Sequence, residues 1–346
     1  MGALSCIMKL SGGDHLKAMV ISGFGGPEVF EWAEVPIPVV TPGHVLIKVA
    51  ASSLNPIDVK IRSGVVPALA PPFPTILHAD VAGHVVEVGE GVSQWQPGDA
   101  VFGCVGGVGA NQGALAEFVL ADARLLARKP EGLSFQTAAL YPLATITAWE
   151  AVMEPGFILP GSKVLVHGAS GGVGHLAAQL AAYQGAFVFG TATSHEKADI
   201  ARQYGTDIAI VAGEQSAAEL VEKYTSGVGF DAIIDTIGGT HLVESFAAAR
   251  IKGQICTINA RTTIDIGPMH SKALTLRLVF MALPLLNGLG RELHGEILTR
   301  AASLIESGRL RVRQADKIFT FEEVADAHRY YETHQAVGKI SLINSF

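Results

Sequence analysis

In the second half of the chain, short apolar strands alternate regularly with segments of helical periodicity. The strands are continuous apolar runs, expected at 164–166, 187–189, 208–211, 233–235 and 254–258, with one more near 276–281. The segments of helical period between them are 172–184, 195–204, 215–225 and 240–249. Strands that are apolar throughout are buried on both faces, as in parallel sheets. The alternation therefore predicts an α/β fold, with a doubly wound parallel sheet between two layers of helices.

A glycine-rich turn follows the first of these strands and opens the first helix: Ala169-Ser170-Gly171-Gly172-Val173-Gly174. It is the GxGxxG frame with alanine at the first position. Without a Cβ at Gly171, the backbone can approach a pyrophosphate closely, and Gly174 lets the helix lie close against the strand. The N–H groups and the dipole at the helix start then favour an anion. Because the turn lies within a series of strand–helix units, we predict that its six residues, 169–174, bind a dinucleotide.

The residues after the second strand bear on which dinucleotide is bound. An NAD site holds the ribose 2′-hydroxyl with an Asp or Glu about 20 residues beyond the glycine turn, but no acid occurs here before Glu196. A missing carboxylate removes the repulsion against a 2′-phosphate, and Thr193, Ser194 and Lys197 offer it two hydroxyl groups and a cation. We therefore predict NADPH. Ser194 is equally suited to cap the next helix and Lys197 to face solvent, and these roles are compatible with phosphate binding.

The first part of the chain has a different pattern. From about residue 17 to residue 129, β-branched runs such as Val45–Val49 and Gly83–Gly89 are separated by proline and glycine clusters, which predicts an antiparallel, barrel-like domain. The tail from Ile318 to Ile343 returns to strand character and is expected to rejoin that domain. We accordingly assign 1–142 and 289–346 to one discontinuous domain, with 1–16 as a flexible leader. Residues 143–288 form the dinucleotide-binding domain.

Composition and charge exclude several classes of protein. The net charge of −7 comes without any cluster of Lys or Arg, which argues against nucleic acid as a partner. The three cysteines are far apart and form no CxxC pair, so neither a disulfide framework nor a zinc ribbon is expected. No apolar run reaches the roughly 20 residues that cross a membrane. We expect a cytoplasmic protein with no membrane partner.

Motifs in both parts of the chain resemble one known family. Those of the first part are Asn55–Asp58, Arg62–Gly64, Gly83–Gly89, Gln96–Val101 and Gly113–Phe118, and those of the second are Thr147–Trp149, His167–Gly174 and Asp235–Gly239. From Lys17 onward the chain is similar to the medium-chain dehydrogenase/reductase superfamily, and within it to the zinc-independent, zeta-crystallin-like quinone oxidoreductases. The resemblance implies a GroES-like β-barrel domain beside a Rossmann domain, and a homodimer.

The zinc enzymes of this superfamily hold their metal with a cysteine in the first motif and a histidine in a Gly-His-Glu motif. The corresponding positions here look like Asn55 and the pair Ala79-Asp80, although His78 lies one residue away. Zinc requires at least three protein ligands, and the first motif offers no cysteine. We predict that no metal is bound. Without a Lewis acid the oxidation of simple alcohols is difficult, whereas a quinone or a conjugated C=C bond is electrophilic already.

The resemblance also suggests residues that act on the acceptor. Asn55 is a candidate donor to its oxygen, although an Asn-Pro turn can equally use the side chain to cap its own backbone. Asp58 resembles the pocket aspartate of the family, or else it anchors the loop. Lys60 lies where some relatives have a tyrosine acid. Arg62 is expected to pair with Asp58 or Asp80.

Four residues outside the glycine turn resemble the family's contacts with the cofactor: Thr147, Asn259, Phe280 and Lys339. Thr147 resembles the residue that meets the nicotinamide end, with packing inside a helix as the alternative. Asn259 and the segment around Phe280 follow late strands of the sheet and are placed to line the nicotinamide pocket. Lys339 is expected near the cofactor phosphates or in solvent. His167, within an apolar strand, is expected to be a hydrogen-bonded core residue.

These observations predict an enzyme, an NADPH-dependent reductase that transfers hydride to quinones or α,β-unsaturated carbonyls without zinc. Relatives often carry a proton-donating tyrosine where this chain has Val66, so the proton is expected to come from water. An enoyl-thioester reductase is a second possibility, and it needs a firm proton donor. A protein that holds NADPH as a sensor, without turnover, is a third.

Overall fold

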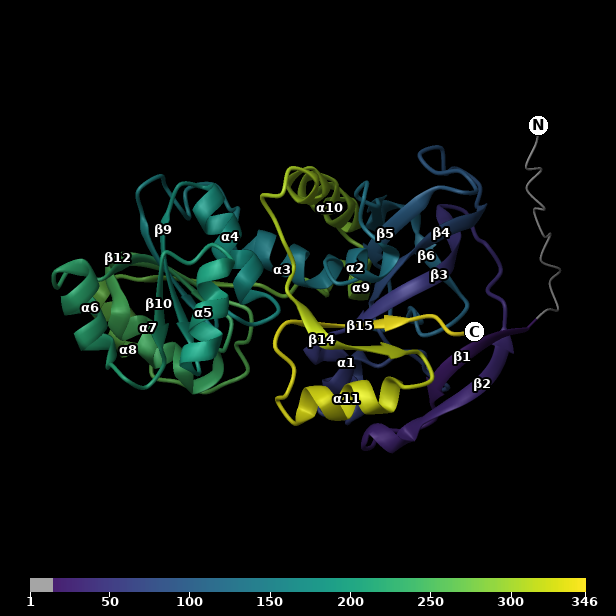
Figure 1. The fold of residues 1–346 in the computed structure, drawn as a ribbon, viewed down its shortest axis with the longest axis horizontal. Helices are drawn as coiled ribbons and strands as arrows, with labels where there is room; N and C mark the ends of the chain where they lie inside the picture. The colour runs from purple at the N-terminus through teal and green to yellow at the C-terminus, as the bar shows by residue number, and fades with distance from the viewer. Residues whose placement is uncertain (1–14) are drawn as a thin grey trace. The chain divides into compact units, whose positions relative to one another are not determined.

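The computed structural model describes residues 15–346 (Figure 1). The chain forms two compact units. The first comprises the residues up to Leu143, Ala282–Ala302 and Gln314–Phe346, and the second comprises Ala144–Met281 and Ser303–Arg313. The leader expected over 1–16 lies outside the described residues except for His15 and Leu16, which begin a strand. The domain boundaries predicted at 142/143 and 288/289 stay a prediction.

The second unit contains a six-stranded sheet in which all neighbouring strands are parallel. Its strands, in order across the sheet, are β10 (Ile208–Val211), β9 (Phe187–Ala192), β8 (Lys163–His167), β11 (Phe230–Asp235), β12 (Ala249–Thr257) and β13 (Thr275–Leu278). Counted along the unit this is the order 3-2-1-4-5-6 of the Rossmann fold, which confirms the predicted doubly wound sheet. In such sheets ligands bind beyond the carboxyl ends of the strands where the order reverses, here at β8 and β11.

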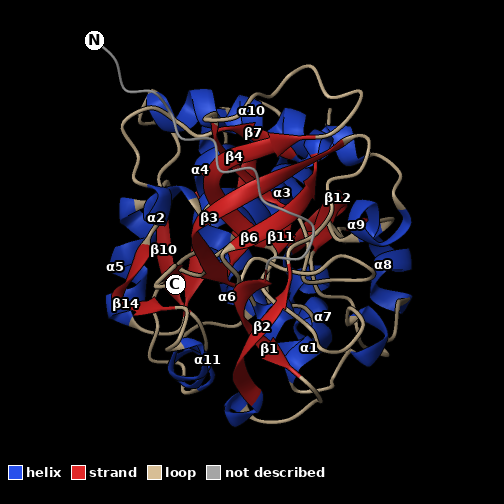
Figure 2. Ribbon diagram, turned by 90° about the vertical axis from the view of Figure 1, so that its right-hand side faces the viewer, coloured by secondary structure: helices blue, strands red, loops and turns tan. Residues whose placement is uncertain are grey.

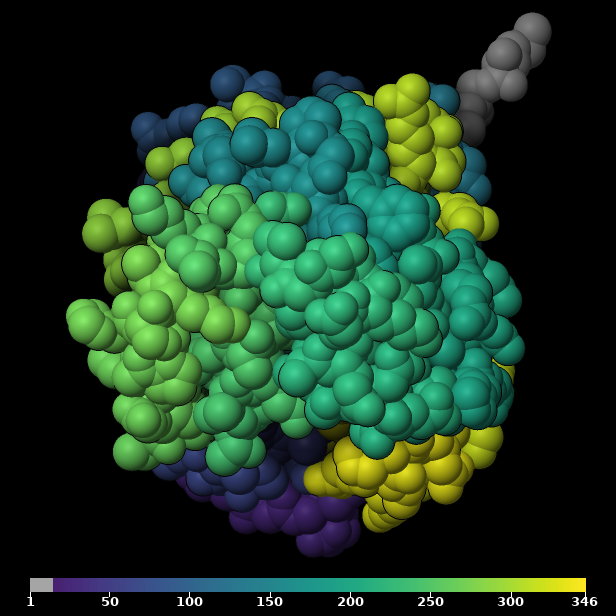
Figure 3. All heavy atoms as spheres, turned by 90° about the vertical axis from the view of Figure 1, so that its left-hand side faces the viewer, coloured from purple at the N-terminus to yellow at the C-terminus, as the bar shows by residue number. Residues whose placement is uncertain are grey.

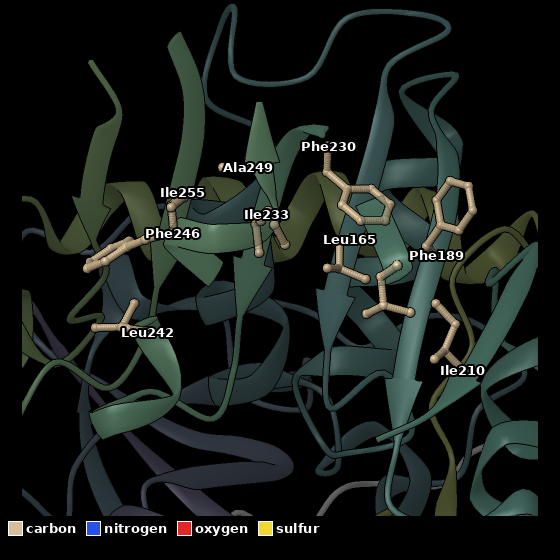
Figure 4. Close-up of a cluster of buried hydrophobic side chains, with 11 residues drawn as sticks. Leu165, Phe189, Ile210, Phe230, Ile233, Leu242, Phe246, Ala249 and Ile255 are labelled. Atoms are coloured by element: carbon tan, nitrogen blue, oxygen red, sulfur yellow. The ribbon is translucent and has the colours of Figure 1, made fainter. Parts of the chain in front are cut away.

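The helices of the second unit follow the predicted pattern: α4 (Gly174–Tyr183), α5 (His195–Gln203), α6 (Ala217–Thr225) and α7 (Leu242–Ala248), with the shorter α8 (Gly267–Lys272). Figure 4 shows the apolar cluster between the sheet and these helices, with Leu165, Phe189 and Ile233 contributed by three neighbouring strands. Phe246 of α7 and Leu220 of α6 complete it from the helical side. Each large side chain buried there contributes about 1.5–3 kcal/mol. Figure 3 shows the outer atoms of this unit in teal and green.

The first unit is built on a mixed sheet around the long strand β3 (His44–Leu54). β3 pairs antiparallel with β4 (Asp80–Val88), β6 (Phe118–Asp122) and β15 (Lys339–Ile343). The sheet continues from β4 through β5 (Ala100–Cys104) to β7 (Leu126–Arg128), and β14 (Gln314–Thr320) lies parallel to β15. The tail therefore rejoins the first sheet, as predicted, and the pairing is antiparallel except for β14 with β15.

Several further elements complete this part of the chain. A two-stranded ribbon of β1 (His15–Ile21) and β2 (Phe30–Pro36) lies at the lower front of Figure 2. The helices are α1 (Pro56–Arg62), α2 (Phe135–Ala138), α9 (Leu283–Asn287) and α11 (Val324–Glu332), while α3 (Pro142–Val152) and α10 (Arg291–Glu306) contribute residues to both units. Among residues 15–346 there is no helix of the length and apolarity needed to cross a bilayer.

The pairing of β3 decides which polar residues meet. Because β3 runs antiparallel to both β4 and β15, its carboxyl end lies beside the first residues of those two strands. Asn55 follows β3, Asp80 begins β4, and Lys339 begins β15. The fold therefore gathers these three side chains at one end of the first sheet.

Candidate active site

The glycine turn links the end of β8 to the start of α4, as the sequence predicts. Gly168 has a φ of +72°, a left-handed conformation that favours glycine. A Cβ at Gly174 would lie 2.1 Å from the carbonyl oxygen of Gly168, and one at Gly171 would lie 3.1 Å from the same atom. Position 174 therefore accepts only glycine unless the backbone moves. Bare backbone at the start of a ten-residue helix fits the pyrophosphate of a dinucleotide.

The other predicted residues of the turn lie in the same short segment. Ala169 is fully buried, and its N–H donates to the carbonyl oxygen of Thr191 on β9 at 2.9 Å, which ties the turn to the neighbouring strand. Ser170 is buried, whereas Gly172 and Val173 are partly exposed. Their role as cofactor ligands stays a prediction.

The end of β9 carries no carboxylate, and the residues predicted for the 2′-phosphate follow it directly. The Ser194 hydroxyl accepts from the N–H of Lys197 at 3.2 Å, so Ser194 caps α5 as one of its two expected roles requires. Thr193 is exposed and the side chain of Lys197 is half-buried. Two hydroxyl groups and one cation therefore lie within five residues of each other, and their contact with a phosphate stays a prediction.

Asn259 follows β12, and its side chain bonds the turn that follows the neighbouring strand β11. Asp235, fully buried at the end of that strand, accepts from the N–H of Ile237 and of the next glycine, each at 2.9 Å. Asn259 donates from Nδ2 to the carbonyl oxygen of Ile237 at 2.9 Å, so both polar side chains hold one turn. Thr147 on α3 is buried, whereas Phe280 is 45% exposed. The nicotinamide contacts assigned to these residues stay predictions.

His167 is a hydrogen-bonded core residue, as expected. Its Nδ1 lies 3.3 Å from the hydroxyl of Thr191, and its ring packs edge-on against that of His241 at 4.4 Å. Burial, together with the charge of His241, lowers the pKa of His167 to about 3. The ring is therefore neutral at physiological pH, beside the start of the glycine turn.

In the first unit, Asn55, Asp80 and Lys339 form a buried polar cluster. Asn55 donates from Nδ2 to Oδ2 of Asp80 at 2.8 Å and accepts at Oδ1 from Nζ of Lys339. The Lys339 Nζ also donates to the carbonyl oxygen of Leu54 at 3.1 Å and lies 3.6 Å from Oδ2 of Asp80. Asp80 further accepts from the hydroxyl of Ser53 at 2.7 Å. Lys339 thus contacts both Asn55, the predicted donor to the acceptor, and Asp80, the partner of the Asn55 amide.

Asp58 lies next to this cluster, at the start of α1. It is fully buried, and its Oδ2 accepts from the N–H of Asn55 at 2.7 Å. Burial raises the pKa of Asp58 to about 7, and the charge of Asp80 acts in the same direction, while the Asn55 N–H opposes both. A proton is therefore present on this carboxyl in a large share of molecules near neutral pH.

Lys60 and Val66 lie at the other end of α1. The carbonyl oxygen of Lys60 accepts from the N–H groups of Val65 at 2.9 Å and Val66 at 3.2 Å, which closes the helix. The Lys60 side chain is half-buried, and Val66 is buried. A role for Lys60 as an acid stays a prediction.

The expected partner of Arg62 was wrong. Its guanidinium group is fully buried and bonds Glu332 of α11, with Nη2 2.5 Å from Oε1, rather than Asp58 or Asp80. Asp58 is bonded to Asn55, and Asp80 is paired with Lys339. Closeness along the chain suggested the wrong carboxylates.

A second buried pair was missed by the sequence reasoning. His78 and His328 are both fully buried, with their Nε2 atoms 3.1 Å apart. Burial, followed by the charge of Lys339, lowers the pKa of His78 to about 3, and burial lowers that of His328 well below its usual value. His78 has a φ of +68°, a strained conformation for a residue other than glycine. Its ring faces a histidine 250 residues away, which no local pattern indicates.

The chemistry of these side chains bears on the metal question. Within residues 15–346, no three His, Cys, Asp or Glu side chains are grouped so that they could hold a metal ion. The Nε2 of His78, the residue considered as a shifted zinc ligand, is directed at His328. The absence of zinc stays a prediction for the purified protein.

Family models match most of both units. A model described as "Alcohol dehydrogenase GroES-like domain" matches residues 41–131, and one described as "Zinc-binding dehydrogenase" matches residues 204–342. The second description is that of the family model and carries no information on whether this chain binds zinc.

Individual relatives agree with the family models. The chain is 33% identical to the NADPH-dependent alkenal/one oxidoreductase of Arabidopsis thaliana chloroplasts, over 94% of this chain and 79% of that protein. It is 32% identical to the human quinone oxidoreductase, over 75% of this chain and 77% of that protein. The Escherichia coli quinone oxidoreductase, solved in complex with NADPH, superposes with a TM-score of 0.83 at 27% identity, over 94% of this chain and 99% of that one. The chain belongs to the medium-chain dehydrogenase/reductase superfamily and is an NAD(P)H-dependent oxidoreductase of the quinone oxidoreductase and alkenal reductase type.

Proposed function

We propose that this enzyme uses NADPH to reduce quinones or α,β-unsaturated carbonyl compounds, without a metal ion. The observation that carries the proposal is the glycine turn, where a Cβ at Gly174 would lie 2.1 Å from a backbone oxygen and only bare backbone fits. The lack of a carboxylate after β9 supports NADPH over NADH, because a 2′-phosphate meets no negative charge there. The names of the Arabidopsis and human relatives support the two acceptor classes.

The residues of the first unit suit an acceptor that is already electrophilic. Bound NADPH supplies the hydride. Asn55 has two hydrogens on Nδ2, and Asp80 takes one of them, which leaves the second for the carbonyl oxygen of the acceptor. Asp58 holds a proton beside Asn55, and exchange with water replenishes it. The chain's own groups therefore orient the acceptor and store a proton.

Steady-state NADPH oxidation tests the proposal directly. The purified protein should oxidise NADPH with 9,10-phenanthrenequinone, 1,2-naphthoquinone or a 2-alkenal, and should use NADH less efficiently. Tight NADPH binding without turnover across this panel would overturn the proposal and favour a sensor. Turnover restricted to enoyl thioesters would instead favour the enoyl-thioester reductase.

We also propose that the enzyme is a homodimer in the cytoplasm. β13 pairs only with β12 within the sheet order, and Leu278 on it is 59% exposed. An edge strand that exposes an apolar side chain is suited to pairing with a second copy. Cys104 and Cys256 are buried and unlinked, as expected in a reducing compartment. Light scattering coupled to size-exclusion chromatography tests the dimer, and cell fractionation tests the location.

A further inference from the structure

Lys339 places an ammonium group in the interior of the first unit. The residue is only 4% exposed, although lysine almost never lies inside a protein without a partner. Its three N–H bonds have three oxygen neighbours: the Leu54 carbonyl, Oδ1 of Asn55 and Oδ2 of Asp80. The charge is therefore compensated by Asp80, and one of its hydrogen bonds goes to the side-chain oxygen of Asn55.

The same arrangement fixes the side-chain amide of Asn55. Its oxygen faces the cation of Lys339 and its nitrogen faces the anion of Asp80. Rotating the amide by 180° would place the NH₂ group against an ammonium and the oxygen against a carboxylate. Both contacts would be repulsive, so only one orientation is stable. A positive charge at the amide oxygen also withdraws electron density from the nitrogen and strengthens its N–H groups as donors.

We propose that Lys339 is a positioning residue: it holds the amide of Asn55 in one orientation and directs the second hydrogen of Nδ2 to the carbonyl oxygen of the acceptor. This inference rests on the proposed function, in which Asn55 orients the acceptor. It differs from two other roles for Lys339. As a mere counter-ion it would only neutralise Asp80, and as a cofactor ligand it would bind the phosphates of NADPH.

Charge-balanced variants separate these roles. Lys339→Met removes the ammonium with little change in shape but leaves the Asp80 charge buried and unpaired, which destabilises the fold. Lys339→Met combined with Asp80→Asn removes both charges, and Asp80→Asn alone gives the part of any loss of kcat that comes from the Asp80 contact with Asn55. Lys272→Met is the matched control, because the Lys272 ammonium also bonds backbone oxygens (Phe246, Ala247 and Ala249) but belongs to the second unit.

Four quantities are measured for each protein: melting temperature, Kd for NADPH, and kcat and KM for 9,10-phenanthrenequinone. Lys339→Met should lower the melting temperature and should lower kcat about 10- to 100-fold, the size expected for a lost hydrogen bond to a charged group. The double variant should regain the melting temperature while kcat stays low. Kd for NADPH should stay within about twofold throughout, and Lys272→Met should keep kcat.

Two results would overturn the inference. Recovery of kcat together with stability in the double variant would make Lys339 a counter-ion only. A large rise in Kd for NADPH in Lys339→Met, with kcat preserved at saturating NADPH, would make it a cofactor ligand.

A measurement without turnover keeps this test separate from that of the proposed function. With ¹⁵N-labelled asparagine, the side-chain NH₂ signals of Asn55 are identified by their loss in Asn55→Asp. They should exchange slowly with solvent in the unsubstituted protein and much faster in the double variant. Unchanged exchange would refute the fixed orientation. If the protein showed the expected exchange rates but reduced none of the acceptors tested, only the proposed function would be refuted.

Discussion

Stability should depend on pH through Asp58, and Asp58→Asn tests this dependence. Asp58 is fully buried, its Oδ1 has no hydrogen-bond partner in the described structure, and burial raises its pKa from 3.8 to about 7. The charge of Asp80 raises this pKa further. The charge of Lys339 and the N–H groups of Asn55 and His78 lower it, but they do not outweigh burial. Because the pKa is higher in the folded than in the unfolded chain, the folded state binds the proton more tightly. Asp58 therefore costs stability increasingly as the pH rises from about 4 to about 7.

The size of the effect follows from the two pKa values. A pKa difference of about three corresponds to about 4 kcal/mol, at about 1.4 kcal/mol for each unit. Asparagine has nearly the same shape as aspartate and does not ionise. It also keeps an oxygen that can accept from the N–H of Asn55, which lies 2.7 Å from Oδ2 of Asp58. Asp58→Asn should therefore raise the free energy of unfolding by about 4 kcal/mol at pH 8 but by only about 1 kcal/mol at pH 4.5.

Urea unfolding at pH 4.5, 6 and 8 measures this difference. Asp122→Asn provides a control of opposite sign, because hydrogen bonds from Arg124 and Arg291 outweigh burial and lower the pKa of Asp122 to about 2. Its stabilising contribution is present above pH 4 and lost toward pH 2, so that variant should be less stable at pH 8. The reasoning about Asp58 is refuted if its substitution changes stability equally at all three pH values, or lowers it at pH 8.

Three further outcomes are expected. Gly174→Ala should weaken NADPH binding about 10-fold or more, measured by fluorescence titration, because the new Cβ meets the Gly168 oxygen at 2.1 Å; Gly23→Ala, where a Cβ meets open space, should not. Lys197→Ala should weaken NADPH more than NADH, and equal losses would remove its assignment to the 2′-phosphate. Elemental analysis should find no stoichiometric zinc, and a chelator should leave the activity unchanged; activity that is lost to the chelator and restored by zinc would contradict this.

The parallel sheet could be predicted in detail because its signals are local. Each strand is a short apolar run, each helix has its own period, and the glycine turn marks where the first strand ends. The expected helix at 195–204 corresponds to α5, and the cap that Ser194 was expected to provide is present. The order of the strands then follows from the fold that such a turn and alternation specify.

The contacts of the first unit could not be predicted in this way, because they join distant segments. Arg62 meets Glu332 270 residues away, and His78 meets His328 across 250. The left-handed backbone of His78 has no signature in the sequence, since that conformation usually indicates glycine. The resemblance of its motif to the family identified Asn55 as a candidate, but not the partners of its amide.

The two sheets differ in how they bring polar residues together. This difference explains why the positions of polar residues in the parallel sheet could be predicted and the contacts of the first sheet could not. In a parallel sheet all carboxyl ends lie at one edge, so His167 and Asp235, at the ends of β8 and β11, are neighbours whatever the loops do. In the first sheet, a site needs the end of one strand and the start of its antiparallel neighbours, as for Asn55 and Lys339. Such a site is defined only once the pairing of β3 with β15 is known. The burial of Lys339, which points to this site because its charge requires a carboxylate from elsewhere in the chain, is likewise known only from the folded structure.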